Sequence, residues 1–167
     1  MNRVLLILLL FCVGFVSCKK GYDEAETVRA QAVKDDQIIQ DYLTANPTVK
    51  AQRVDSAGVA TGVYYLVLNP GEGNALFTSS TQVTVNYTGK ILTTGVKFTE
   101  SGRFTPSFRL GDVIRAWQLG IPQVKKGGHV RILAPSRYAY GSFDQPEIGL
   151  PANSVVDFDI NLLDVTN

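Results

Sequence analysis

The segment SVVDFDINLLDV, residues 154–165, constrains the fold more than any other part of this 167-residue chain. Four apolar residues between Val156 and Leu162 alternate with three polar ones. Successive side chains of a strand point to opposite faces, so this pattern predicts a strand with one buried face. The apolar face of a sheet built on such a strand needs a second layer to cover it.

Four earlier segments also have strand character. TQVTVNYTGKIL at 81–92 alternates in the same way, and GVYYLVLNPGEG at 62–73 leads into a Pro-Gly turn. TPSFRLG and GHVRILAPS predict two shorter strands, and between them a short helix carries the only tryptophan, Trp117, with Asp112 as its predicted N-cap. Several antiparallel strands and one short helix predict an α+β domain whose sheet wraps around that helix.

A longer amphipathic helix is expected before this domain, over residues 24–45. Asn46-Pro47 ends it, because a residue that precedes proline is pushed out of helical geometry. Residues 19–24 are interpreted as a tether. Three roles fit the helix. It can act as a spacer, pack on the domain, or pair with the helix of a second copy as a dimerisation arm.

Residues 1–17 have the pattern of a signal peptide. Arg3 precedes the apolar run VLLILLLFCVGFV, which is followed by Ser17 and Cys18. The run is shorter than the roughly 20 apolar residues that span a bilayer. FVSC resembles a bacterial lipobox, with phenylalanine at the usual leucine position. We expect a lipoprotein lipidated at Cys18; a plain secretory signal is the alternative.

Cysteine and charge usage support an exported protein. Cleavage before Cys18 leaves that residue as the one cysteine of the mature chain, so no internal disulfide can form. Basic and acidic side chains then balance, and without a basic stripe nucleic acid is not an expected partner. The expected domains are 1–17 (signal peptide), 18–57 (tether and helix) and 58–167.

Few residues offer acid–base, nucleophilic or metal chemistry. The only histidine, His129, is expected in a solvated turn with no acidic partner, and the carboxylates at 35–36 and at 157 and 159 are expected on exposed faces. No phosphate-binding or paired-cysteine motif is present, so no cofactor and no metal are expected.

Aromatic and aliphatic residues remain, and one reaction needs little else. Rotation about an X-Pro bond has a barrier of about 18–20 kcal/mol because it breaks amide resonance. A dry aromatic pocket favours the twisted, less polar transition state over the hydrated planar amide. No proton transfer or nucleophile is required.

Three stretches resemble signatures of the FKBP-type peptidyl-prolyl cis/trans isomerases. These are VTVNYTGKILTTGVKFTES, FRLGDVIRAWQLGIPQVKKGGHVRILAPSRYAYG and GLPANSVVDFDINLLDV. The resemblance as a whole covers about residues 62–166, in order and without large gaps. The resemblance implies a twisted antiparallel half-barrel on one short helix. It also implies a pocket with Trp117 as its floor, in which the Ile114 backbone N–H and the Tyr140 hydroxyl donate to substrate. The full implied pocket is Tyr87, Phe98, Thr99, Phe108, Val113, Ile114, Trp117, Tyr140, Leu150 and Phe158.

Three positions depart from the family pattern. Thr99 stands where aspartate is usual, which is expected to weaken macrolide binding more than catalysis. Ala116 replaces the usual glycine before the tryptophan, and Pro106 stands where many members have a pocket aromatic or a small residue.

The sequence therefore predicts a lipid-anchored isomerase of the cell envelope that acts on proline-containing exported polypeptides. Lys19 after the cysteine favours the outer membrane, with the domain facing the periplasm. The loop at 142–150 is expected to set sequence preference. The alternative is a weak or inactive FKBP-like chaperone that binds peptides without isomerising them. The protein is expected to be a monomer or a helix-mediated dimer.

Overall fold

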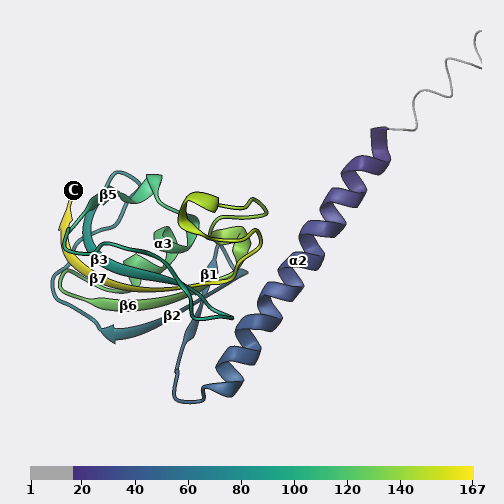
Figure 1. Ribbon diagram of the computed structural model, residues 1–167. Helices are drawn as coiled ribbons and strands as arrows, with labels where there is room; N and C mark the ends of the chain where they lie inside the picture. The colour runs from purple at the N-terminus through teal and green to yellow at the C-terminus, as the bar shows by residue number, and fades with distance from the viewer. Residues whose placement is uncertain (1–16) are drawn as a thin grey trace, which may run out of the picture. The chain divides into compact units, whose positions relative to one another are not determined.

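The structure, a computed structural model, describes the backbone of residues 17–167 and the side chains of residues 24–167 (Figure 1). The predicted signal segment before Ser17 and the side chain of Cys18 lie outside these described residues. The chain divides into two compact units, with the boundary between Lys34 and Asp35.

Helix α2 runs Ser17–Ala45, so it begins before the predicted start at 24 and includes the segment expected to be a tether. Its C-terminal part, from Asp35 on, belongs to the same unit as the sheet. The strands of that unit are β1 Gln52–Ser56, β2 Val59–Asn69, β3 Gln82–Ile91, β4 Lys97–Glu100, β5 Ser107–Arg109, β6 His129–Ala134 and β7 Val156–Thr166. One short α-helix, α3 Arg115–Gly120, and the 3-10 turns η2 Leu110–Asp112, η3 Ile121–Gln123, η4 Ser136–Tyr138 and η5 Pro146–Ile148 complete it.

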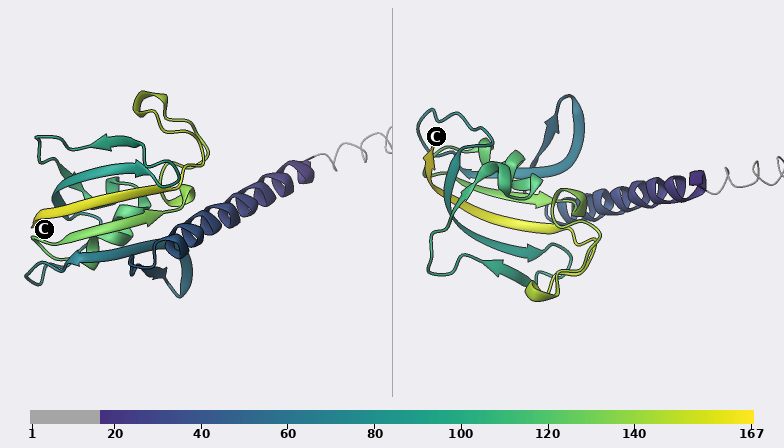
Figure 2. Two further views of the ribbon diagram at one scale, coloured as in Figure 1. Left: turned by 60° about the horizontal axis from the view of Figure 1, so that its bottom comes forward. Right: turned by 90° about the horizontal axis from the view of Figure 1, so that it is seen from above.

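The strands form one antiparallel sheet in the order β1-β2-β6-β7-β3-β4, with β5 paired to β3. Its two end strands, β1 and β4, do not pair with each other, so the sheet stays open. Figures 1 and 2 show it curving around α3. The predicted α+β fold, with a half-barrel sheet on one short helix and a helix before it, is confirmed.

The core lies between the sheet and α3. Alternate residues of β7 from Val156 to Leu162 are buried, and the polar residues between them are half-buried on the other face. The same alternation buries Val83 and Val85 on β3. The period-2 pattern of the sequence therefore predicts correctly which face of β7 is covered, and which face of β3 at its start.

The other face of the sheet packs against the C-terminal part of α2. Ile39 is fully buried there against Leu92, Leu133 and Val155. Leu133 follows Ile132, a residue of the α3-side core, so the two neighbours point to opposite faces. The end of α2 is thus part of the domain, and the expected boundary at 57/58 falls between the paired strands β1 and β2.

Two short strands and one helix cap differ from what the sequence predicts. β1 and β4 are short, and neither shows a clear alternating pattern. Helix α3 begins at Arg115 with Ile114 as its N-cap, so the prediction of Asp112 as N-cap is wrong. Asp112 instead ends the 3-10 turn that precedes the helix.

Candidate functional site

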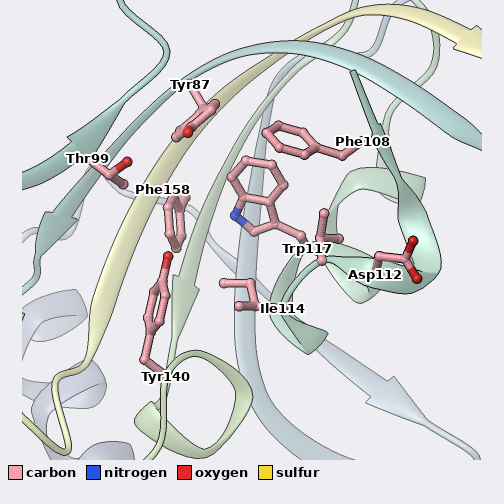
Figure 3. Close-up of a pocket in the computed structure, with 9 residues that line it drawn as sticks. Tyr87, Thr99, Phe108, Asp112, Ile114, Trp117, Tyr140 and Phe158 are labelled. Atoms are coloured by element: carbon pink, nitrogen blue, oxygen red, sulfur yellow. The ribbon is translucent and has the colours of Figure 1, made fainter. Parts of the chain in front are cut away.

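Trp117 forms the floor of a cavity between α3 and the sheet (Figure 3). Its side chain is almost fully buried, and three aromatic rings stand edge-on to the indole. The ring centroids of Tyr87, Phe158 and Phe108 lie 5.0, 5.3 and 5.8 Å from that of the indole, at interplanar angles of 75 to 89°. Such edge-to-face pairs are favourable beyond the area they bury, and they fix the orientation of the indole.

Gln118 holds the turn that leads into α3. Its side-chain amide donates to the carbonyls of Val113 at 2.8 Å and Gly111 at 3.2 Å, and Arg115 donates to its carbonyl oxygen at 2.8 Å. Ile114, the N-cap residue that follows this turn, has non-helical backbone angles, with φ −55° and ψ 149°. Its N–H donates to no other described group, so it is available to a ligand carbonyl. The sequence does not predict this role of Gln118, because a glutamine on a short helix is part of no motif.

Strands β3, β5 and β7 supply the walls, with Tyr87, Phe108 and Phe158 respectively. Gly89, two residues after Tyr87 on β3, lets the side chains of Phe158 on β7 and Thr99 on β4 lie close over its backbone. A Cβ there would lie 2.7 Å from side-chain atoms of both Phe158 and Thr99, which no packed structure tolerates. The glycine of the VNYTG motif is therefore needed for the shape of the cavity.

The cavity has a volume of about 260 Å³, and most of its lining comes from the predicted set. Eight of the ten predicted pocket residues line it, together with Asp112; the predicted ones are Tyr87, Thr99, Phe108, Val113, Ile114, Trp117, Tyr140 and Phe158.

Phe98 and Leu150, the other two predicted residues, do not line the cavity but belong to the core behind it. Phe98 stands edge-on to Phe158 at 5.7 Å and to Tyr140 at 5.8 Å, so it supports two lining rings. The sequence did not predict Asp112 as a lining residue, because its position before a helix suggested a cap.

Tyr140 faces the cavity from the turn after η4. Burial, with a smaller effect of nearby Tyr87, raises the pKa of its hydroxyl above the ordinary value. The hydroxyl therefore stays protonated at neutral pH. It makes no hydrogen bond to another described residue, and Figure 3 shows it pointing toward the middle of the site.

The three departures from the family pattern have separate structural consequences. Thr99 lines the cavity, whereas Glu100 faces away and pairs with Lys97 at 2.5 Å, so it does not replace the missing carboxylate. Ala116 is fully buried in the core. Pro106 is not part of the lining; its carbonyl accepts from the Val85 N–H at 3.1 Å, and Phe108 supplies the wall.

Three expectations about isolated polar residues are wrong. His129 lies on β6, not in a turn, and its Nε2 is 2.7 Å from Asp159 Oδ1. Asp157 accepts two hydrogen bonds from Arg131, and Asp35 is fully buried. None of these residues lines the cavity. Their partners lie 26 to 101 positions away in the chain, beyond the reach of local patterns.

An open antiparallel sheet wrapped on one short helix, with an aromatic cavity between them, defines an FKBP-like domain. The family model described as FKBP-type peptidyl-prolyl cis-trans isomerase matches residues 73–163. The chain therefore belongs to this family.

Curated relatives include the FKBP-type peptidyl-prolyl cis-trans isomerase FkpA of Buchnera aphidicola subsp. Acyrthosiphon pisum. It is 35% identical over 156 residues, which cover 92% of this chain and 62% of the relative. FkpA of Escherichia coli K12 is 43% identical over 108 residues, 64% of this chain and 38% of the relative. The chain thus spans less than two thirds of these relatives. Fkbp12 of Drosophila melanogaster is 36% identical over 62% of this chain and 98% of its own length.

Solved structures agree with the fold. The crystal structure of FkpA from Escherichia coli superposes with a TM-score of 0.64 at 30% identity, covering 99% of this chain and 74% of that one. A peptidyl-prolyl cis-trans isomerase from Pseudomonas syringae has a TM-score of 0.60 at 24% identity, with 77% and 96% covered, and supports the fold alone.

Proposed function

We propose that the protein is a peptidyl-prolyl cis/trans isomerase whose active site is the cavity above Trp117. The observation that carries this proposal is the composition of the lining. Aromatic and aliphatic side chains dominate it. Among the described residues, the Ile114 N–H, the Tyr140 hydroxyl and the buried Trp117 Nε1–H are donors without a hydrogen-bond partner. Such a site can bind a proline ring and exclude water from the twisted amide.

Catalysis follows from differential binding. The planar X-Pro amide is strongly hydrated, and moving it into an apolar cavity removes that hydration. The twisted amide is less polar, so it loses less on entering the cavity. The Ile114 N–H donates to the substrate carbonyl, and the Tyr140 hydroxyl is a second donor in the same cavity. The side chains are not required to exchange protons with the substrate.

The decisive experiment uses the soluble chain of residues 19–167. Its isomerisation rate is measured on proline tetrapeptides and on a protein whose refolding is limited by proline. A rate well above the uncatalysed one on either substrate supports the enzyme. Background rates on both, from a protein shown to be folded, contradict it.

Replacing Thr99 with aspartate is expected to raise kcat/KM several-fold and to strengthen macrolide binding. A carboxylate is a stronger acceptor than a hydroxyl, and Figure 3 places Thr99 on the same side of the cavity as Tyr87. The control is Thr99→Asn, which matches the shape without the charge and is expected to stay near the parent. Equal rates for all three proteins would show that the missing carboxylate does not limit activity.

The reaction is expected to be independent of pH between about pH 6 and 9. No histidine, cysteine or lysine lines the cavity, and the pKa of Tyr140 is raised, so its proton is retained throughout this range. The measurement is kcat/KM in constant-ionic-strength buffers. A bell-shaped or sigmoidal profile in this range would contradict a mechanism without proton transfer.

A peptide-binding chaperone is the second candidate, and two exposed rings favour it. Phe104, on the loop between β4 and β5, is 80% exposed, and Phe143, on the loop at 142–150, is 75% exposed. Both loops adjoin lining residues, namely Thr99 and Tyr140. Exposed aromatic side chains at the rim offer apolar contacts to an unfolded chain on either side of its proline.

Phe143→Ser is expected to lower kcat/KM several-fold for the refolding protein and to leave the tetrapeptide rate within about twofold. A tetrapeptide ends before it reaches the rim, whereas a protein chain continues past it. Leu76→Ser, a change at an equally exposed apolar residue on the β2–β3 loop, is the control. Equal losses on both substrates would place Phe143 in the site rather than at its rim.

We also propose export and lipid attachment at Cys18, with anchoring in the outer membrane. The support is the sequence pattern of residues 1–18. Among the described residues, no helix combines the length and apolarity needed to cross a membrane. Cys18→Ser is expected to move the protein from the membrane fraction to the soluble fraction. Retention in the membrane fraction would contradict lipid anchoring through this residue.

The dimer that the sequence suggests would pair two chains through the N-terminal part of α2, and the alternative is a monomer. The truncation that tests this removes the residues before Asp35. A truncation after residue 47 would also remove Ile39, Tyr42 and Leu43, which pack on the sheet. Equal monomer masses for chains beginning at 19 and at 35 would exclude the dimer.

A further inference from the structure

Asp35 is a fully buried carboxylate outside the cavity. It lies in the part of α2 that belongs to the same unit as the sheet. Its Oδ2 accepts two hydrogen bonds from Ser136, one from the backbone N–H at 2.8 Å and one from the hydroxyl at 2.7 Å. Burying a carboxylate is costly unless hydrogen bonds compensate for the lost water. This arrangement therefore fixes Ser136 firmly against α2.

Ser136 in turn organises the backbone around Tyr140. Its carbonyl accepts hydrogen bonds from the N–H groups of Ala139 and Gly141, both at 2.9 Å. These two residues are the neighbours of Tyr140 on either side. One residue, Ser136, thus connects the buried carboxylate to the turn that presents the Tyr140 hydroxyl to the cavity. Gly141 adopts a positive φ of 73°, so the turn depends on these bonds and on glycine.

The neighbouring carboxylate, Asp36, provides a contrast. Its side chain is half-exposed and lies 3.7 Å from Arg137 Nη2, while the same nitrogen donates to the Thr61 carbonyl at 2.8 Å. An exposed pair at this separation contributes little. Two adjacent residues of one helix therefore differ in burial and in partner: the buried Asp35 bonds to Ser136, whereas the half-exposed Asp36 lies near Arg137.

We propose that Asp35 is a positioning residue for the isomerase site. It holds Ser136, and through Ser136 it sets the Ala139–Gly141 turn and the place of the Tyr140 hydroxyl relative to Trp117. Small displacements of a catalytic donor lower rates strongly, even when the change lies far from the reacting bond. This inference rests on the proposed isomerase activity. It adds a role for α2 in that activity, because the helix supplies the carboxylate.

The test compares Asp35→Ala with Asp36→Ala in the 19–167 chain, which keeps all of the unit from Asp35 on. Both are measured at a temperature where circular dichroism shows each variant to be folded. We expect kcat/KM to fall about tenfold for Asp35→Ala and to stay within about twofold for Asp36→Ala. Asp35→Asn keeps an oxygen that can accept from Ser136 and is expected to recover most of the loss. Ser136→Ala removes only the hydrogen bond of the hydroxyl and changes the core less. Its kcat/KM is expected to lie between that of Asp35→Ala and that of the parent.

A double variant separates positioning from general stability. In a Tyr140→Phe background, which lacks the hydroxyl, Asp35→Ala is expected to change kcat/KM by less than about twofold, because the two changes act on the same group. A second readout does not depend on activity. The amide protons of Ala139 and Gly141 are expected to exchange about tenfold faster in Asp35→Ala, with those of β3 and β7 unchanged.

The outcomes distinguish the two proposals. Parent-like kcat/KM in folded Asp35→Ala, or an equal loss in the Tyr140→Phe background, would overturn the positioning role. A parent protein with no activity would instead overturn the isomerase proposal. In that case the exchange rates at Ala139 and Gly141 would still decide whether Asp35 holds the turn.

Discussion

Replacing Trp117 with leucine is expected to lower kcat/KM by at least about tenfold while the protein remains folded. Leucine fills part of the space and keeps the floor apolar, but it cannot offer a flat aromatic surface to a proline ring. A tenfold loss corresponds to about 1.4 kcal/mol of transition-state binding. The measurement is kcat/KM on the tetrapeptide substrate, with far-ultraviolet circular dichroism to verify the fold.

Phe77→Leu is the matched control for this change. Phe77 packs against the same core but does not line the cavity. Its replacement is expected to cost stability without a comparable loss of kcat/KM. If Trp117→Leu kept parent-like kinetics, the cavity above the indole would not be the active site. The peptide-binding site of the alternative function would then also have to lie elsewhere on the protein.

Replacing Arg131 with alanine is expected to lower the free energy of unfolding by about 3 kcal/mol. The guanidinium makes two hydrogen bonds of 2.8 Å to the two carboxylate oxygens of Asp157, and its Nη2 also donates to the Tyr42 hydroxyl of α2 at 2.5 Å. Both charged side chains are largely buried. Alanine would leave the carboxylate without its partner, and leaving a buried charge unpaired costs more than the pair itself contributes. Urea unfolding measures the loss.

The double variant Arg131→Met, Asp157→Leu provides the comparison. It removes both charges and keeps apolar volume, so its stability is expected to lie much closer to the parent than that of Arg131→Ala. A loss as large as that of Arg131→Ala would mean that the pair itself, rather than the unpaired carboxylate, accounts for the effect. Neither residue lines the cavity, so the specific activity of folded protein is expected to be unchanged in both variants.

The sequence predicted the sheet well wherever a strand has one covered face. Alternation in β7 and β3 identifies the buried side directly, because the period of a strand is two residues. β1 and β4 escaped prediction because they are short and lie at the ends of the sheet, where burial is incomplete. The start of α2 was placed too late, because residues 19–23 have polar and glycine residues that suggested a tether.

Most of the cavity lining was predicted from the family resemblance, while composition alone suggested only an apolar pocket. What the sequence could not show are contacts between distant polar residues. Asp35 and Ser136 are 101 positions apart, and nothing in DDQIIQ indicates that the first carboxylate is buried and the second is not. Helical periodicity predicts which face of α2 is buried. It does not predict which polar residue near that face is covered, because this depends on a hydrogen-bond partner such as Ser136 in the distant turn η4.

Trp117 is also the only tryptophan of the chain, and this gives the cavity a built-in optical reporter. Because the indole lies in an apolar setting at the floor of the site, its fluorescence emission is expected at short wavelength in the folded protein. A ligand that enters the cavity must contact the indole, so emission changes report occupancy without any label. The same signal reports global unfolding, and the two transitions can be followed in one sample.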